Sequence, residues 1–343
     1  MRKYCSWFLS ILILFIAVFI YSCGAKHQRV VRRSFYYWKS VFKLQPAEAG
    51  AFGNLNIETL YIKFFDVVWN DEEKKAEPVA QVKFAQLPSS TVSVTPVVFI
   101  TNEALQQLSL SRADSLAANI IKLLAALAAN PSLRLSKEIQ IDCDWTAATK
   151  EKYFRLLTAF RNNNYCKGKI LSATIRLHQL KFVSESGVPP VDKGLLMCYN
   201  MGNLRHPETT NSIIEPGEFK KYTKRLSLYP LSLDIALPVF DWWVWFRGEH
   251  YKGLIHSDEM KWPGSSNKKI IFQNDTLLNR YTFEKGDWLR YENSPVESLN
   301  EIANTLRHKL ANDSINVILY HLDENNLSKY STHELESIFD SFH

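Results

Sequence analysis

The stretch Ser172–His178 reads Ser-Ala-Thr-Ile-Arg-Leu-His, with polar side chains at even positions and apolar side chains at odd positions. Alternation with a period of two is typical of a β-strand that has two different faces. In a closed barrel, helices cover the outer face of each strand, and the inner face holds polar groups near the mouth. We therefore expect Arg176 and His178 to point into a barrel lumen near the carboxyl ends of the strands, where barrel enzymes have their active sites.

Eight apolar, strand-like runs follow one another along the chain, and most are separated by helical segments. Strands that alternate with helices predict a parallel sheet, and eight such units close most naturally into a barrel. The strand-like runs are 30–38, 60–69, 97–101, 139–145, 169–178, 194–201, 231–240 and 315–322. The clearest helices are 112–129, which Asn130-Pro131 ends, 148–162, 216–226, and 296–311, which Ser294-Pro295 begins.

The predicted organisation is therefore α/β, with one (β/α)8 barrel over residues 30–343. The stretch 249–292 does not fit the alternation, because it contains the turn-forming sequence Pro263–Ser266 and several short β-like runs. We interpret it as a small α+β insertion between the seventh strand and the last helix.

The N-terminus has the features of an export signal. Arg2 and Lys3 precede an apolar run over 7–21, which is shorter than the roughly 20 apolar residues of a membrane span. The following Ser22-Cys23 resembles a bacterial lipobox, which predicts a signal peptide over 1–22, lipidation of Cys23, a tether over 23–29, and a place in the cell envelope. The alternatives are an uncleaved signal anchor, since Tyr21 is bulky and a basic run follows, or a wrongly assigned start.

Charge and cysteine content exclude several classes of function. The net charge of +6 is too small to indicate nucleic-acid binding, and much of it lies in 26–33, where it would meet anionic lipid headgroups. Cys143, Cys166 and Cys198 form neither a disulfide framework nor a zinc pattern, and Cys143 and Cys198 are expected to be buried. The sequence has no phosphate-binding glycine loop or nucleophile elbow, so no cofactor is expected.

An acidic segment lies in the fourth predicted strand. Residues 140–146 read Gln-Ile-Asp-Cys-Asp-Trp-Thr, so Asp142 and Asp144 share one face of the strand and are expected to point inward, with Asp144 nearer the mouth. Two like charges inside a barrel need a compensating group, and Arg176 on the next strand is the obvious partner. The group is either a structural ion pair or part of a functional site.

Asp142-Cys143-Asp144-Trp145 resembles the D-x-D-W part of the D-x-x-D-x-D-W-E signature of the family 18 glycoside hydrolases, which are chitinases and lectin-like relatives. Three further segments resemble the family in the same order: 197–200 its M-x-Y-D strand, 233–240 its G-I-P-F-Y strand, and 291–323 its Y-D-D-x-x-S segment, helix and final strand. The resemblance spans about 140–323 and implies a glycan-binding barrel with an insertion where many chitinases carry one.

The chain departs from the family at four functional positions. Thr146 stands at the catalytic Glu, Ile139 at the first Asp of the signature, Asn200 at the Asp of M-x-Y-D, and Tyr320 at the Trp that forms the floor of the sugar site. A Thr hydroxyl cannot protonate a glycosidic oxygen at neutral pH, whereas a carboxylic acid can. The family's substrate-assisted hydrolysis is therefore not expected here.

The first hypothesis for function is lectin-like glycan binding, since indole rings at strand ends can stack on sugars. Trp69, Trp243 and Trp245 add to the aromatic content of these ends, although such rings also cap barrel cores. The residues expected to contact a sugar are Trp38, Asp66, Trp145, Arg176, His178, Tyr199, Asn200, Trp242 and Tyr320.

Two other hypotheses stay open. A glycoside hydrolase would use Asp144 as general acid or charge stabiliser together with Asp142, Asp66 or Asp241, or His178 as base. A metal held by Asp142, Asp144 and His178 is a weaker variant of this idea, because the ligands lack a known spacing. The third hypothesis is a non-catalytic envelope scaffold that uses the outer barrel surface for protein contacts, since fold alone does not decide function.

Overall fold

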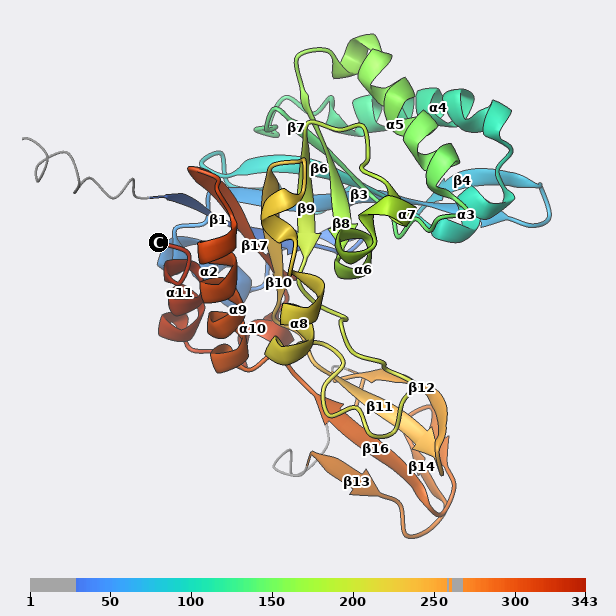
Figure 1. Cartoon of the computed structure of the whole chain (residues 1–343), viewed down its shortest axis with the longest axis vertical. Coiled ribbons are helices and arrows are strands. Elements are labelled where there is room, and N and C mark those ends of the chain that lie inside the picture. Colours follow the sequence, from blue (N-terminus) through green and yellow to red (C-terminus); the bar gives the residue numbers. More distant parts are fainter. Residues whose placement is uncertain (1–28, 258, 261–267) are drawn as a thin grey trace, which may run out of the picture.

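The computed structural model describes residues 29–257, 259–260 and 268–343. The predicted signal peptide, Cys23 and all of the predicted tether except Arg29 therefore lie outside the described residues. Eight parallel strands form a closed barrel, because β1 pairs with both β3 and β17 (Figure 1). The barrel strands are β1 (Val30–Tyr37), β3 (Thr59–Asn70), β6 (Ser93–Ile100), β7 (Glu138–Asp142), β8 (Ile170–Arg176), β9 (Lys193–Met197), β10 (Leu233–Pro238) and β17 (Ser314–Tyr320).

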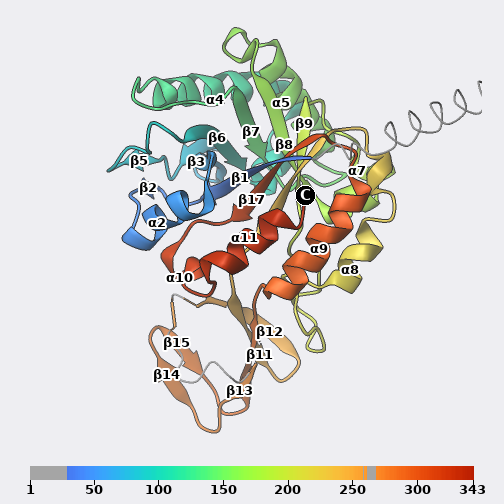
Figure 2. The same ribbon diagram turned by 90° about the vertical axis from the view of Figure 1, so that its left-hand side faces the viewer.

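The predicted (β/α)8 fold is thus confirmed, and each of the eight predicted runs overlaps one barrel strand. Helices cover the outside of the barrel, with α4 and α5 on one side and α2, α8, α9 and α11 on another (Figure 2). They are α2 (Pro46–Leu55), α3 (Asn102–Gln107), α4 (Ala113–Ala128), α5 (Lys150–Asn162), α6 (Leu177–Lys181), α7 (Val183–Ser186), α8 (Pro216–Tyr222), α9 (Val296–Lys309), α10 (Glu324–Leu327) and α11 (Thr332–Asp340).

The helix α4 shows why these segments form an outer layer. Its buried residues Leu116, Ile120 and Leu124 recur every four positions and so make one apolar stripe that packs on the barrel. The helix ends just before Asn130-Pro131, and α9 begins just after Ser294-Pro295, as the sequence predicts. Within the part of the chain that the structure describes, none of the helices has the length and apolar character needed to cross a bilayer.

The third barrel unit differs from the others, because no helix connects β3 to β6. Instead, β4 (Lys75–Val79) pairs antiparallel with the end of β3, and β5 (Lys83–Phe84) forms a short ladder with β2 (Val41–Phe42).

The insertion follows β10 and lies beyond the barrel body in Figure 1. It begins at Trp242, earlier than the expected boundary at 249, and its described residues form strands and turns. A four-stranded sheet, in the order β12-β11-β16-β13, packs around a separate core that includes Trp243, Phe272 and Leu289. The strands are β11 (Trp242–Arg247), β12 (His250–His256), β13 (Lys269–Ile271) and β16 (Asp287–Glu292), with a hairpin of β14 (Thr276–Leu278) and β15 (Tyr281–Phe283).

A charged cluster fills the lumen at the N-terminal end of the barrel. Lys193 Nζ lies 2.8 Å from Glu138 Oε2 and 2.5 Å from Asp234 Oδ2, and Ser172 donates a hydrogen bond of 2.6 Å to Glu138. Burial opposes the charge on Lys193, but the two carboxylates raise its pKa above the ordinary value. The two carboxylates thus compensate the charge of Lys193 inside the barrel.

Candidate functional site

The two acidic side chains of the D-x-D segment both point into the barrel but differ in exposure. Asp142 is the last residue of β7, is only 3% exposed, and accepts a hydrogen bond of 2.6 Å from Thr174 Oγ1. Asp144 lies two residues further along the same face, and its side chain is 42% exposed. Solvent therefore reaches Asp144 at the mouth, whereas Asp142 lies beneath it.

Arg176, the last residue of β8, binds both oxygens of Asp144. Its Nη2 lies 2.6 Å from Asp144 Oδ2, and its Nε donates to Asp144 Oδ1. Burial opposes the charge of the guanidinium, but these two hydrogen bonds and the carboxylate charge raise the pKa of Arg176. The guanidinium also lies over the ring of Tyr199, 5.9 Å from its centroid, which fixes its position in the mouth.

Asp142 is held in an environment that disfavours its charge. Burial, followed by the nearby negative charge of Asp144, raises the pKa of Asp142 from about 3.8 to about 7, although Thr174 and Arg176 oppose this shift. A proton is therefore taken up beneath the mouth close to neutral pH. Both oxygens of Asp144, in contrast, accept hydrogen bonds from Arg176.

Aromatic rings form the floor of the mouth. Tyr320 on β17 is central, with its ring centroid 5.4 Å from Tyr199, 5.5 Å from Trp38 and 5.9 Å from Phe240. Tyr199 is buried, whereas Trp38 and Tyr320 are half-buried and keep part of their surface in contact with solvent. The mouth is thus a shallow aromatic floor beside a charged pair.

The buried polar atoms without a hydrogen-bond partner among the described residues include Tyr199 OH and Asp66 Oδ1 in this region. The other oxygen of Asp66 accepts a hydrogen bond of 2.8 Å from Lys63, whose ammonium lies 5.4 Å from the ring centroid of Trp38. Buried polar groups in folded proteins are nearly always paired, so unpaired atoms indicate a place where water or a ligand binds. Lys63 was not among the residues expected from the sequence, although a lysine inside an apolar strand is a signal in itself.

Trp145 does not contribute to the mouth, so its assignment as a sugar contact is corrected. It is fully buried, its ring stacks on Tyr153 with centroids 5.1 Å apart, and its Nε1 donates to the carbonyl of Ser186 at 3.0 Å. The alternation that turns Asp142 and Asp144 inward turns Trp145 outward, against α5. Its indole packs the layer between barrel and helix.

His178 and Asn200 also differ from the expectation. The strand β8 ends at Arg176, and His178 lies on α6 as an exposed side chain instead of pointing into the lumen. Partial burial, together with the charge of Arg176, lowers its pKa. Asn200 is exposed after β9 and adopts a positive φ of 55°, and its backbone N–H donates to the carbonyl of Ile213.

Asp241, expected from the sequence as a partner acid, lies at the junction between barrel and insertion. It is 4% exposed, its Oδ1 is bound by Lys329 and Ser257, and its Oδ2 accepts a hydrogen bond of 2.5 Å from Tyr291. Every oxygen is therefore occupied by structural partners.

The tryptophans of the insertion are mainly structural. Trp242 is 8% exposed and donates a hydrogen bond of 2.8 Å to Glu292, while its ring contacts Phe240 at the edge of the mouth. Trp243 packs in the core of the insertion, and Trp245 is half-buried and donates to Asp287. Only Trp242 connects this group to the aromatic floor.

The described residues offer no cluster of three or more His, Cys, Asp or Glu side chains that could hold a metal ion. The three remaining cysteines, Cys143, Cys166 and Cys198, are free and buried. The described side chains at the mouth are carboxylates, a guanidinium, hydroxyls and aromatic rings.

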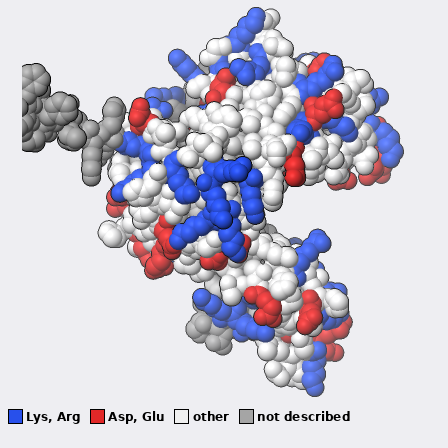
Figure 3. Space-filling model, in the orientation of Figure 1, with Lys and Arg blue, Asp and Glu red and all other residues white. Residues whose placement is uncertain are grey.

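Figure 3 shows that the molecular surface is hollowed between the barrel body and the insertion. The barrel strands in Figure 1 run toward this side of the body, and β10 leads directly into the insertion. The aromatic floor and the Asp144–Arg176 pair thus lie at the barrel end from which the insertion projects.

The sequence matches no family profile and no curated protein. Solved structures, however, match over most of the chain. The Bacillus cereus spore cortex-lytic enzyme SleL has a TM-score of 0.55 and 12% identity, covering 92% of this chain and 75% of that one. The chitinase ChiB of Flavobacterium johnsoniae, from glycoside hydrolase family 18, has a TM-score of 0.55 and 12% identity, covering 92% and 94%. A chitinase of Chromobacterium violaceum has a TM-score of 0.54 and 9% identity, covering 90% and 99%. This protein therefore has the barrel fold seen in family 18 chitinases and in a spore cortex-lytic enzyme.

Proposed function

We propose that this protein binds a glycan at the barrel mouth without hydrolysing it by the route of the chitinases. The observation that carries this proposal is the partly exposed aromatic floor beside the Asp144–Arg176 pair, next to which two buried polar atoms, Tyr199 OH and Asp66 Oδ1, have no partner among the described residues. A sugar ring offers hydroxyls that would satisfy such atoms and an apolar face that stacks on Trp38 or Tyr320. The exposed edge of the Asp144–Arg176 pair supplies further donors and acceptors.

The arrangement near Asp144 argues against the inherited hydrolysis. Thr146, at the position of the family's catalytic acid, takes part in the turn that starts α5, where its N–H binds Thr149 Oγ1 at 2.9 Å and its carbonyl accepts from Lys150. Both oxygens of Asp144 accept hydrogen bonds from Arg176, which holds the carboxyl group against the guanidinium. Neither group is placed to protonate a leaving oxygen.

The fold supports a glycan as the ligand, since the similar structures are chitinases and a spore cortex-lytic enzyme. We expect a saturable interaction with chitin oligosaccharides or peptidoglycan fragments, and N-glycan fragments are the third class to compare. Calorimetric titration of the purified full chain in detergent tests this. Absence of binding to all three classes would refute the proposal.

Hydrolysis by other carboxylates is a second candidate, favoured by the raised pKa of Asp142 of about 7. A general acid needs such a pKa, but Asp142 is 3% exposed and bonded to Thr174. Release of reducing ends from chitin oligosaccharides, lost in Asp142→Asn, would establish this candidate over simple binding.

The proposal includes attachment to the cell envelope through the lipobox-like Ser22-Cys23. Incorporation of labelled palmitate in bacterial cells is expected to disappear in Cys23→Ala and to persist in Cys5→Ala, the matched control. Membrane association without labelling would indicate an uncleaved signal anchor instead of a lipid anchor. A chain found only in the aqueous fraction would refute both forms of attachment.

A further inference from the structure

The point at which the chain enters the barrel is fixed at its N-terminal end. Arg29 donates hydrogen bonds to the carbonyls of Leu310 at 2.5 Å and Asn312 at 2.9 Å, and the N–H of Val30 binds the carbonyl of Asp313 at 2.8 Å. The first described residue is thus tied to the loop that precedes β17. An anchor upstream of Arg29 would therefore hold the N-terminal end of the barrel close to the membrane.

The distance between that end and a membrane is limited by the sequence. The apolar run ends at Tyr21, and only residues 22–28 separate it from Arg29. A fully extended chain spans at most about 3.6 Å per residue, so the eight steps from Tyr21 to Arg29 reach about 30 Å at most. A lipid on Cys23 would shorten this reach further.

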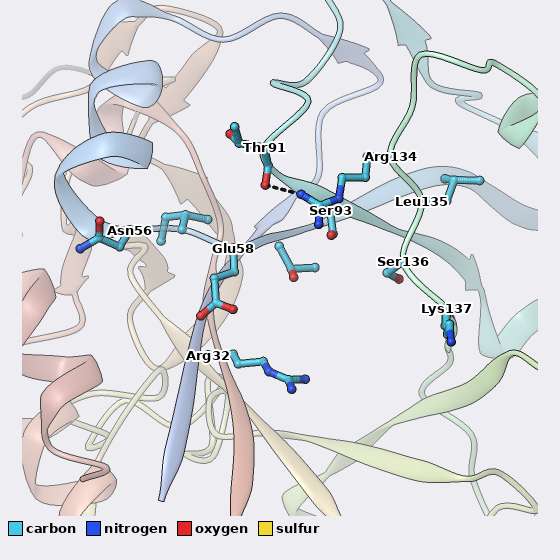
Figure 4. Close-up of a pocket in the computed structure, with 11 residues that line it drawn as sticks. Arg32, Asn56, Glu58, Thr91, Ser93, Arg134, Leu135, Ser136 and Lys137 are labelled. Atoms are coloured by element: carbon cyan, nitrogen blue, oxygen red, sulfur yellow. Dashed lines mark hydrogen bonds between the residues drawn. The ribbon is translucent and has the colours of Figure 1, made fainter.

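The surface around this entry point carries basic side chains. A pocket of about 710 Å³ lies between the starts of β1, β3 and β6, with Arg32, Arg134 and Lys137 at its walls and Glu58 beside them (Figure 4). A second hollow, of about 580 Å³, shares Lys137 and continues to Lys167. Arg32, Lys137 and Lys167 are exposed, and their side chains have no ion pair or hydrogen bond to another described residue.

Apolar side chains are exposed at the same end. Val30 at the start of β1 is 55% exposed, and Ile170 at the start of β8 is 41% exposed. The exposed acids at this end include Glu58, Asp313, Asp192, which is paired with Arg161 at 3.3 Å, and Asp340, which is paired with Arg33 at 2.7 Å. Unpaired bases mixed with apolar side chains match a bilayer surface, where anionic headgroups lie above acyl chains.

We infer that the N-terminal face of the barrel, formed around Arg32, Lys137 and Lys167, docks on an anionic lipid surface and directs the mouth away from the membrane. This inference rests on the membrane attachment proposed above. All eight barrel strands are parallel, so their carboxyl ends, with Asp144 and Tyr320, lie at the end opposite the docked face. The orientation exposes the proposed glycan site to the space beyond the membrane.

Site-specific photocrosslinking of the full chain in vesicles tests the docking. A benzophenone amino acid at Ser132, which is exposed in the loop before β7, is expected to crosslink lipid in vesicles that contain phosphatidylglycerol. The same group at Leu277, which is 74% exposed on the insertion, is expected not to crosslink. Lipid crosslinking from Leu277 and not from Ser132 would overturn the inferred orientation.

Charge reversal separates electrostatic docking from mere proximity. The variant Arg32→Glu/Lys137→Glu/Lys167→Glu is expected to lower the crosslinking yield from Ser132 about tenfold or more, as is a change to neutral phosphatidylcholine vesicles. The matched control, Lys252→Glu/Lys268→Glu/Lys285→Glu on the insertion, makes the same charge change and is expected to leave the yield unaltered.

Co-sedimentation with vesicles, measured in the same samples, distinguishes failure of the docked face from failure of the membrane attachment. A chain that sediments with vesicles but gives equal yields in all variants refutes the docked face and leaves the attachment intact. A chain that does not sediment refutes the attachment and, with it, the docking. Glycan titration is independent of both outcomes.

Discussion

Arg176 on β8 donates two hydrogen bonds to Asp144 beyond the end of β7, with Nη2 lying 2.6 Å from Oδ2. The pair joins neighbouring strands at the barrel mouth, and the Asp144 side chain remains 42% exposed. Exposure on this scale screens the attraction, so the pair is expected to contribute only about 1 kcal/mol to the free energy of unfolding. Its geometry is better suited to presenting a fixed donor and acceptor array to a ligand.

The substitution Asp144→Asn is expected to lower glycan affinity at least tenfold, because it removes the charge and one of the two bonds to Arg176. The free energy of unfolding should change by about 1 kcal/mol or less. Calorimetry and urea denaturation measure the two effects. The matched control is Asp114→Asn, which breaks a similar two-bond pair with Arg155 on the outer helices. A large loss of stability with unchanged affinity would identify Asp144–Arg176 as a purely structural pair.

The substitution Tyr199→Phe removes a buried hydroxyl that has no partner in the described structure. The free protein is expected to keep or slightly increase its melting temperature, since no hydrogen bond is lost, while glycan affinity falls about fivefold or more. Tyr229→Phe is the control, because its hydroxyl is also buried and unpartnered but belongs to the connection that leads into the start of β10. Equal effects of the two substitutions on affinity would exclude a ligand contact at Tyr199.

The two tryptophans Trp145 and Trp38 are expected to behave in opposite ways. Trp145→Ala removes a fully buried ring and should cost about 3–5 kcal/mol in unfolding free energy. Trp38→Ala, at a half-buried ring of the floor, should lower the unfolding free energy less than Trp145→Ala does and should lower glycan affinity more. Thermal denaturation and titration of both variants check this. An unchanged glycan affinity in Trp38→Ala would show that this ring does not contact the glycan.

The pKa of Asp142, raised to about 7, predicts a specific pH dependence. Between about pH 4 and pH 7 the folded protein holds a proton that the unfolded chain has released. Stability of the native chain should therefore decline relative to Asp142→Asn as pH rises through this window, by a few kcal/mol at most. Urea denaturation of both proteins at pH 4, 5.5 and 7 measures the difference. A difference that does not vary with pH would show that Asp142 titrates normally.

The fold was predictable because its signals are local and repeated. Runs of apolar residues marked all eight barrel strands, and Asn130-Pro131 and Ser294-Pro295 marked two helix boundaries correctly. The start of the insertion was harder to predict, because the aromatic run at Trp242 fits a strand of the barrel and a strand of the added sheet equally well. Only the antiparallel pairing of β11 with β12 and β16 distinguishes these possibilities.

The site was predictable only where a strand continued regularly. The alternation through Asp142 and Asp144 held beyond the end of β7, but β8 gave way to α6 after Arg176, which turned His178 away from the lumen. The neighbours Lys63 and Asp66 are three residues apart and would face opposite sides of a regular strand. A register shift in β3 between Lys63 and Phe65 accompanies the 2.8 Å contact between Lys63 and Asp66. No pattern in the sequence predicts that shift.

The most direct test of glycan binding at the mouth is calorimetric titration of the full chain with chitin and peptidoglycan oligosaccharides, repeated with Tyr199→Phe and Tyr229→Phe. Glycan binding at the mouth predicts saturable binding that weakens in Tyr199→Phe and is unchanged in Tyr229→Phe, with both variants folded. No binding by the native chain, or identical affinities in all three proteins, would contradict it.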